Sequence, residues 1–214
     1  MSAASGLSDT FFALLADLGA RHATDPEVFL AVWNAESDLK PSAINAQSGA
    51  RGLNQMIPRT LRGLGAPVAF ERLSGEAQLP WIELLIVDGE RRNEGPFTSA
   101  ARYYHSNFFP RTMSRGASPA TVVVARDAAD SDERAAYAAN AGLDVDHDGR
   151  ITLADLGAWI ARRSRRAGYA TARARLELAA GGFVRTTART LGAAIVVPVL
   201  LGVAVLVTSW KAAR

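Results

Sequence analysis

The stretch Asn34-Ala-Glu-Ser-Asp-Leu-Lys-Pro-Ser-Ala43, followed by Ser48-Gly-Ala-Arg-Gly-Leu-Asn-Gln-Met-Ile-Pro-Arg-Thr60, is the most informative part of this 214-residue chain. It places a single carboxylate, Glu36, near the end of an apolar segment that starts at Asp25-Pro26, a strong helix start. Pro41 predicts where that helix ends, so Glu36 is expected in or just past its last turn. A Gly-rich turn with the polar residue Gln55 follows, and Pro58 can open another helix.

Most of the remaining chain has the apolar spacing of helices. That spacing is present in residues 7–20, 79–92 and 98–109, and helices are also expected at 155–165 and 169–189. Asp130-Ser-Asp-Glu133 resembles a capping box and predicts a helix toward Asn140. One short β-branched run, residues 121–124, is the exception. We therefore predict a mainly α fold.

The position of Glu36 suits proton donation to the leaving oxygen of a glycosidic bond. A carboxylic acid can do this only when its pKa is raised enough to keep it protonated. The partial negative charge of a helix C-terminus and desolvation by apolar neighbours both act in that direction. An isolated glutamate there would be read as a solvated helix-end charge, but the surrounding pattern favours a catalytic acid. No second catalytic carboxylate is indicated: Asp38 is expected off the same face, and Glu71 and Glu76 belong to no motif.

Residues 34–60 resemble the catalytic core of soluble lytic transglycosylases and goose-type lysozymes, whose pattern is Glu-Ser, Pro-x-Ala and Gly-Ala-x-Gly-Leu-x-Gln-x-x-Pro-x-Thr. The resemblance implies a lysozyme-like (transglycosylase SLT) helical domain in which Glu36 is the single general acid and then base, and in which Gln55 lines the cleft. It implies cleavage of the MurNAc–GlcNAc β-1,4 bond of peptidoglycan. Ring closure to a 1,6-anhydromuramoyl end is favoured over hydrolysis. Ser37 is expected to contribute to the same site by fixing the orientation of Glu36.

The family also has a cleft tyrosine. Ala101-Arg-Tyr-Tyr-His-Ser-Asn-Phe-Phe-Pro110 resembles the variant of this element found in phage-encoded members, which assigns the role to Tyr104. Tyr137 is a competing candidate, and core packing is the alternative for either tyrosine. Asn54 stands where the family usually has an apolar residue, so this position departs from the family pattern and bears on the polarity of the cleft.

A second motif, residues 144–155, fits a twelve-residue Ca²⁺ loop of the EF-hand type. The expected ligands are Asp144, Asp146, Asp148, the Arg150 carbonyl, Thr152 and Asp155. Asp155 replaces the usual glutamate at position 12, which makes the loop similar to those of dockerins. The alternative is an Asp-rich turn before a capped helix, but three acids in five residues would repel one another in an empty loop. A structural Ca²⁺ is therefore predicted. The three histidines are too scattered for a zinc motif.

The C-terminal part of the chain predicts membrane attachment. Residues 190–210 contain no charged side chain, and as a helix they would span roughly 31 Å, close to the hydrocarbon thickness of a bilayer. Arg189 precedes the segment, and Trp210 and Lys211 end it, as is typical of spanning helices. The alternative is a buried core helix. A C-terminal transmembrane helix is the prediction because the segment is long and apolar on all sides.

Charge is unevenly distributed along the chain. Residues 162–189 carry eight arginines and one glutamate, and Lys211 and Arg214 add two positive charges, which leaves −6 for residues 1–161 of the overall +3. We divide the chain into a catalytic domain (1–125), a helix–loop–helix extension (126–168), a basic juxtamembrane segment (169–189) and the span (190–210). The arginine-rich part could bind nucleic acid or anionic lipid, or be a solvated charge cluster.

These features together predict a membrane-anchored lytic transglycosylase. The chain has no cysteine, which excludes disulfides and thiolate sites, and its N-terminus has no secretory signal. The phage-like tyrosine element favours a virion component, with other virion proteins as partners, that opens the host cell wall during infection. The alternatives are a cellular envelope enzyme for wall remodelling and a catalytically silent scaffold with a basic neck.

Overall fold

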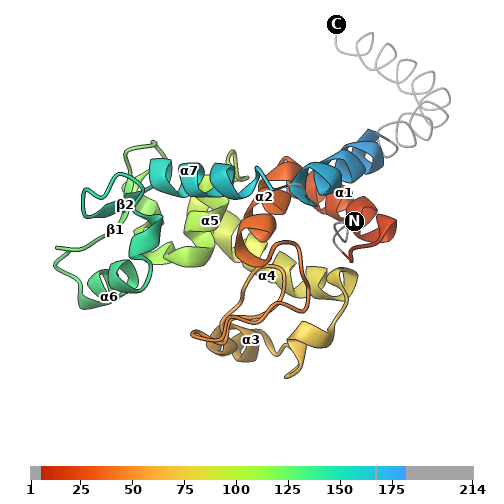
Figure 1. Cartoon of the computed structure of the whole chain (residues 1–214), viewed down its shortest axis with the longest axis horizontal. Coiled ribbons are helices and arrows are strands. Elements are labelled where there is room, and N and C mark those ends of the chain that lie inside the picture. The colour runs from red at the N-terminus through yellow and green to blue at the C-terminus, as the bar shows by residue number, and fades with distance from the viewer. Residues whose placement is uncertain (1–5, 167, 182–214) are drawn as a thin grey trace, which may run out of the picture.

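The computed structural model describes residues 6–166 and 168–181, and they form a mainly helical protein, as predicted (Figure 1). The helices are α1 (Asp9–Arg21), α2 (Pro26–Ser37), α3 (Pro58–Leu64), α4 (Gly75–Asn93), α5 (Ala100–Phe108), α6 (Ser131–Ala139) and α7 (Leu153–Arg163). Short 3₁₀ helices are η1 (Phe70–Arg72), η2 (Pro110–Arg115) and η3 (Ala141–Leu143), and the strands are β1 (Val122–Ala125) and β2 (Arg150–Thr152). Residues 168–181 form a further helix.

Helix α2 is the centre of the fold. It starts as predicted: the Asp25 side chain accepts a hydrogen bond from the Glu27 amide, and Pro26 occupies the first turn. Eight of its twelve residues are buried, because α1, α5 and α7 all pack against it. The last turn of α2 therefore reaches the middle of the molecule rather than its surface.

An aromatic cluster joins these helices. Phe29 and Trp33 of α2 stack with ring centroids 6.0 Å apart, and Tyr103 of α5 meets Phe29 edge-on at 5.0 Å. Phe11 of α1 packs against Trp33. All four side chains are fully buried. Because burying one such side chain contributes roughly 2–3 kcal/mol, this cluster fixes the angle between α2 and α5.

The two strands tie the predicted extension to the predicted catalytic domain. β1, which the β-branched run predicts, pairs antiparallel with β2, which the sequence did not predict; Val124 lies opposite Ile151. The predicted boundary at 125/126 therefore falls between two paired strands. Helix α7 then packs on α5 and α2, so residues 126–163 share the core of the first domain (Figure 1).

The helix of residues 168–181 lies alongside α1 (Figure 1). Tyr169, Ala172 and Leu176 form its buried stripe, at helical spacing. Within the two described ranges, no helix is both long enough and apolar enough to cross a bilayer. The predicted span, residues 190–210, lies outside the described residues.

Candidate active site

A cavity of about 580 Å³ opens where the end of α2, the Gly-rich turn, α4, α5 and α7 come together. Glu36 is one of its lining residues, together with Gln55 from the turn and Tyr104 from α5. Three of the residues predicted to form the site are thus brought together, and the first and last of them are 68 residues apart in the sequence. A cavity of this size is typical of a small-molecule or oligosaccharide subsite.

Glu36 lies in the last turn of α2, as predicted. The helix ends because Asp38 and Leu39 both adopt left-handed backbone angles, with φ of 53° and 58°. The residue is partly exposed through the cavity, but burial of its carboxyl group raises its pKa to about 7. Hydrogen bonding with the Tyr104 hydroxyl and the positive charge of Arg163 oppose this rise. At neutral pH both the acid and the carboxylate are therefore populated.

Tyr104 is held by a ladder of stacked groups. Its ring stacks on Phe108 at 6.0 Å and on Trp159 at 5.3 Å, and the Arg163 guanidinium lies 5.3 Å from the centroid of Trp159. Burial and the nearby Glu36 carboxylate raise the pKa of Tyr104 well above its usual value. The hydroxyl therefore stays protonated and can donate to the carboxylate of Glu36.

Asn54 is a buried hydrogen-bond hub behind the cleft. Its Oδ1 accepts hydrogen bonds from Trp33 Nε1 at 3.0 Å, from the Tyr103 hydroxyl at 3.0 Å and from Asn107 Nδ2 at 3.1 Å. The polar residue that departs from the family pattern is thus fully integrated into the core. It links the Gly-rich turn to α2 and α5 and also lines the cavity.

The Gly-rich turn depends on Gly52. Its φ is +77°, and a Cβ at this position would lie 2.6 Å from both Gln78 Oε1 and Phe70 Cε1. Gln55, with φ of +43°, donates from Nε2 to the Gly52 carbonyl at 2.9 Å, which fixes its amide at the rim of the cavity. The turn thus presents Asn54 and Gln55 in defined orientations.

The other carboxylates that could be considered for proton transfer are each held by a hydrogen bond or an ion pair. Asp88 is the one further carboxylate among the described residues that line the cavity, and Arg91 and Arg92 hold its two oxygens. Outside the cavity, Asp38 is exposed and pairs with Arg166. Glu71 pairs with Arg51, and Glu76 accepts a hydrogen bond from the Ser8 hydroxyl. Of these five carboxyl groups, Glu36 is therefore the one with an environment suited to proton transfer.

The region around Glu36 matches a known family of protein domains. Residues 14–80 match the transglycosylase SLT domain. The match includes Glu36, Asn54 and Gln55 and ends within α4. Searches of curated proteins and of solved structures give no significant match. The transglycosylase SLT match supports a lytic transglycosylase type of enzyme acting on peptidoglycan, in line with the mainly helical fold.

The remaining predicted site residues lie elsewhere. The Ser37 hydroxyl donates to the Trp33 carbonyl at 2.9 Å, and the residue is not among those lining the cavity, so its hydroxyl is used within α2 and not at the site. The Tyr137 hydroxyl donates to Asp144 Oδ2 at 2.7 Å, which places this tyrosine at the aspartate loop rather than in the cleft. Between the two tyrosine candidates, the structure brings Tyr104 to Glu36.

Sequence reasoning missed the wall of the cleft that α7 provides. Trp159 and Arg163 line the cavity although they lie outside the transglycosylase SLT match. In the sequence Arg163 counts only as one of the eight arginines of residues 162–189, because a run of arginines carries no information about tertiary neighbours. Asn107 was also missed, although it lies within the quoted tyrosine element.

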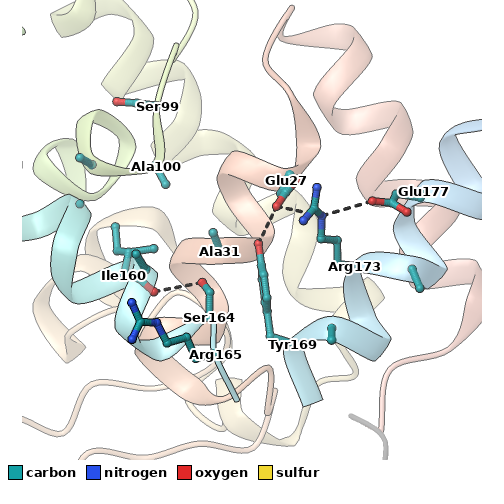
Figure 2. Close-up of a pocket in the computed structure, with 15 residues that line it drawn as sticks. Glu27, Ala31, Ser99, Ala100, Ile160, Ser164, Arg165, Tyr169, Arg173 and Glu177 are labelled. Carbon is teal, nitrogen blue, oxygen red and sulfur yellow. Dashed lines mark hydrogen bonds and ion pairs between the residues drawn. The ribbon is translucent and has the colours of Figure 1, made fainter. Parts of the chain in front are cut away.

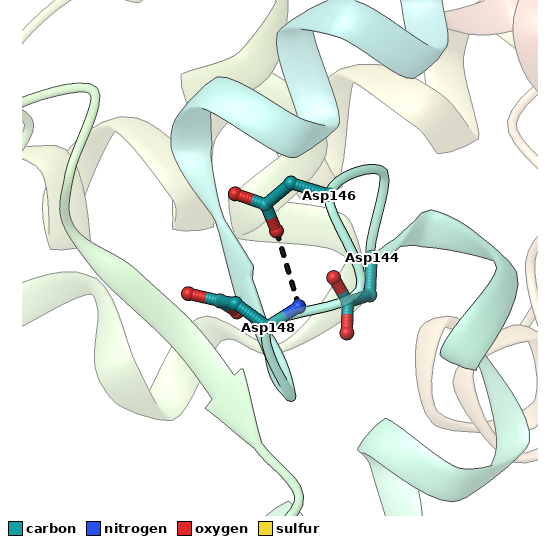
Figure 3. Close-up of side chains that lie close together, drawn as sticks. All are labelled: Asp144, Asp146 and Asp148. Carbon is teal, nitrogen blue, oxygen red and sulfur yellow. Dashed lines mark hydrogen bonds between the residues drawn. The ribbon is translucent and has the colours of Figure 1, made fainter.

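The aspartate loop gathers Asp144, Asp146 and Asp148, whose side-chain ligand atoms lie within 4.8 Å of one another (Figure 3). Asp144 is buried, and its Oδ1 has no hydrogen-bond partner among the described residues. The carboxylate of Asp155 is used differently: it accepts hydrogen bonds from the backbone amides of Val145 and Thr152 and caps α7. The three aspartates thus fit a hard cation, while Asp155 is not grouped with them.

The basic segment docks on the acidic part of the chain. Figure 2 shows Tyr169 and Arg173 directed at Glu27 of α2, with Oε1 of Glu27 3.1 Å from each. They line a second cavity, of about 760 Å³, beside this helix. Arg175 pairs with Asp9 at 2.7 Å and lies 4.4 Å from the Phe12 ring centroid. Some of the positive charge of the basic segment is therefore paired with acidic side chains of α1 and α2 in the same chain.

Proposed function

We propose that the protein is a peptidoglycan lytic transglycosylase that cleaves the MurNAc–GlcNAc β-1,4 bond. The observation that carries the proposal is the Glu36 carboxyl group, whose pKa burial raises to about 7 in a cavity that Tyr104 and Gln55 also line. A pKa near the working pH is what a group needs to act first as an acid and then as a base. The match of residues 14–80 to the transglycosylase SLT domain supports the same substrate class.

In the first step, protonated Glu36 donates its proton to the glycosidic oxygen, and the bond from the muramoyl C1 to that oxygen breaks. The Tyr104 hydroxyl and the Arg163 charge, which favour the ionised form of Glu36, stabilise the carboxylate that this step produces. In the second step, that carboxylate takes the proton from the C6 hydroxyl of the same sugar. The C6 oxygen then forms the new bond to C1, and no water is consumed.

The environment of Asp88 favours this ring closure over hydrolysis through a second carboxylate. An inverting hydrolase needs a free carboxylate to activate water, and a retaining one needs a free nucleophile. Arg91 and Arg92 hold both oxygens of Asp88. Mass spectrometry of the released muropeptides tests the proposal: 1,6-anhydro ends are expected. Reducing ends alone would show that the enzyme is a hydrolase. The absence of any product would favour the alternative of a catalytically silent scaffold.

The pH dependence of the reaction is a first prediction. Because Glu36 must be protonated in the first step and its pKa is raised to about 7, kcat/KM is expected to fall as pH rises above 7. Replacing Arg163 by Gln removes a charge that lowers this pKa, so the alkaline limb should move to higher pH, whereas Arg163→Lys should leave it in place. A limb near the usual pKa of glutamate, 4.5, would contradict the proposed role.

We further propose that the aspartate loop binds a structural Ca²⁺. Asp144, Asp146 and Asp148 would hold the ion, and the unpartnered Asp144 Oδ1 would become a ligand. The loop leads through Thr152, the N-cap of α7, into the helix that carries Trp159 and Arg163. Bound Ca²⁺ would therefore stabilise the wall of the cleft and leave the chemistry to Glu36.

The calcium proposal predicts a thermal shift. Saturating Ca²⁺ should raise Tm by roughly 5–10 °C over EGTA-treated protein, since a ligand at 100 times its Kd adds about 2.7 kcal/mol. Asp148→Asn should abolish the shift. Asp127→Asn, an exposed aspartate outside the loop, should retain it. An equal Tm for wild type in Ca²⁺ and in EGTA would contradict the proposal.

Membrane attachment through residues 190–210 and a place in a phage particle complete the proposal. Their support is the uncharged 21-residue segment with its flanking Arg189, Trp210 and Lys211, and the phage-like element around Tyr104. The test is to locate the chain in purified particles or in a cell envelope. Recovery of the full chain in a wash without detergent would contradict the membrane part.

A further inference from the structure

The orientation of the Asn54 amide follows from its neighbours. The Trp33 indole N–H can only donate, and it lies 3.0 Å from one terminal atom of Asn54. That atom is therefore the acceptor Oδ1, and the Tyr103 hydroxyl also donates to it. Nδ2 of Asn54 must be the other terminal atom. It has no partner among the described residues and is not enclosed by protein, so it opens to the cavity that Asn54 lines.

The same logic fixes Asn107. The atom of Asn107 that lies 3.1 Å from Asn54 Oδ1 faces an acceptor, so it is the donor Nδ2. The Oδ1 of Asn107 is then the group left over, and it accepts no hydrogen bond within the described part of the chain. Asn107 lines the same cavity as Glu36 and is partly exposed. Two adjacent side chains thus present one free N–H donor and one free C=O acceptor.

A donor beside an acceptor is complementary to a secondary amide, which offers one C=O and one N–H. We propose, on the basis of the proposed function, that Asn54 and Asn107 bind the acetamido group of an N-acetylated hexosamine next to the scissile bond. Asn54 Nδ2 donates to the acetyl oxygen, and Asn107 Oδ1 accepts from the acetamido N–H. The amides of the stem peptide have the same chemistry, so the experiment must separate the two sources.

Burial gives this pair its selectivity. Asn54 is 5% exposed, and three hydrogen bonds prevent its amide from turning. A substrate that lacks the acetyl group would leave a preorganised donor without a partner. Sites built to hydrogen-bond a substrate group reject analogues without it for that reason. The pair would therefore determine specificity, while proton transfer remains with Glu36.

The experiment crosses a change in the enzyme with a change in the substrate. Wild type and Asn54→Asp are compared on N-acetylated glycan strands and on chemically N-deacetylated strands. Aspartate keeps an acceptor for Trp33 and Tyr103 but replaces the donor by oxygen. Wild type should prefer acetylated strands by at least about tenfold, in the range of a lost substrate hydrogen bond. Asn54→Asp should lower that ratio at least about fivefold, since a single hydrogen bond is worth that much or more.

The change in the ratio is the decisive measurement, because deacetylation can slow the reaction for other reasons and a poorly folded variant loses rate on both substrates equally. Asn140→Asp adds the same charge to another residue lining the cavity and should keep the wild-type ratio. An unchanged ratio in Asn54→Asp, or a wild type without preference, overturns the inference. The inference is also overturned if wild type prefers acetylated strands only after an amidase has removed the stem peptides. In that case the stem-peptide amides would be the groups that Asn54 and Asn107 bind in intact strands. If wild type cleaves none of these strands, the proposed function fails instead.

Discussion

Replacing Glu36 by Gln should lower the rate of peptidoglycan cleavage about 10³-fold, within the range of general acid–base catalysis by one side chain. Glutamine has the same shape but cannot donate a proton to the glycosidic oxygen, and no other carboxyl group among the residues lining the cavity is free to replace it. The measurement is the release of soluble muropeptides at pH 6, where most of the wild-type Glu36 is protonated. Circular dichroism of both proteins shows whether the fold is retained.

Asp38→Asn is the matched control for this experiment. It removes a carboxylate two residues away, but Asp38 is exposed and pairs with Arg166 outside the cavity. Its activity should remain within about twofold of wild type, because exposed ion pairs contribute little. Comparable losses in the two variants would mean that the end of α2 matters as a structure and not as a proton donor.

Glu36→Gln is also expected to change the pH dependence of stability. The pKa of Glu36 is raised in the folded state, so its contribution to stability is complete below pH 4.5 and is lost as pH rises to about 7. The total loss is on the order of 3 kcal/mol. The glutamine of Glu36→Gln cannot ionise, so this variant should not lose stability in this way as pH rises. Relative to wild type, the variant should therefore gain stability in urea melts between pH 4.5 and pH 8. A constant difference across that range would contradict the raised pKa.

Local signals in the sequence account for the part of the site that α2 and the Gly-rich turn provide. Asp25 and Pro26 mark the start of α2, and the chain reversal after Glu36 follows from Pro41 and the turn. These are interactions between near neighbours, which a sequence pattern records directly. They place Glu36 at the end of α2, whereas the position of Gln55 at the same cavity was implied by the family resemblance and not by these local signals.

The other wall of the cleft could not be predicted in this way. Trp159 and Arg163 reach Glu36 only because β1 pairs with β2 and α7 folds back over α5, and such long-range pairing leaves no periodic signal. Asn54 was recognised as unusual, but its three donors come from α2 and α5. Asp155 fits a ligand position by spacing, yet its carboxylate caps α7, because both roles favour an acid at that place.

Gln78 is the residue whose replacement should destabilise the fold most directly. It is fully buried in α4, accepts a hydrogen bond from the Leu53 amide at 2.9 Å and donates to the Pro41 carbonyl at 2.8 Å. It therefore ties Pro41, near the start of the loop, to Leu53, the residue just before Asn54 and Gln55. No motif in the sequence identifies it, since a glutamine inside a helical segment is usually a solvated residue.

Gln78→Met keeps the length of the side chain and removes its hydrogen bonds. The buried Leu53 amide is then left without a partner, at about 1–3 kcal/mol, and the part-buried Pro41 carbonyl loses its donor as well. We expect a loss of about 3 kcal/mol in the free energy of unfolding and a fall in Tm of roughly 10 °C. Gln47→Met, in the same loop but exposed, should change Tm by less than about 2 °C.

Hydrogen exchange separates a local effect from a global one. In Gln78→Met the Leu53 amide loses its acceptor, so it should exchange faster under native conditions even where the amides of α2 keep their protection. Activity should fall as well, because Asn54 and Gln55 are presented by the segment that Gln78 holds. A variant with wild-type exchange at Leu53 would show that the turn is held by Gly52 and the aromatic core, without Gln78.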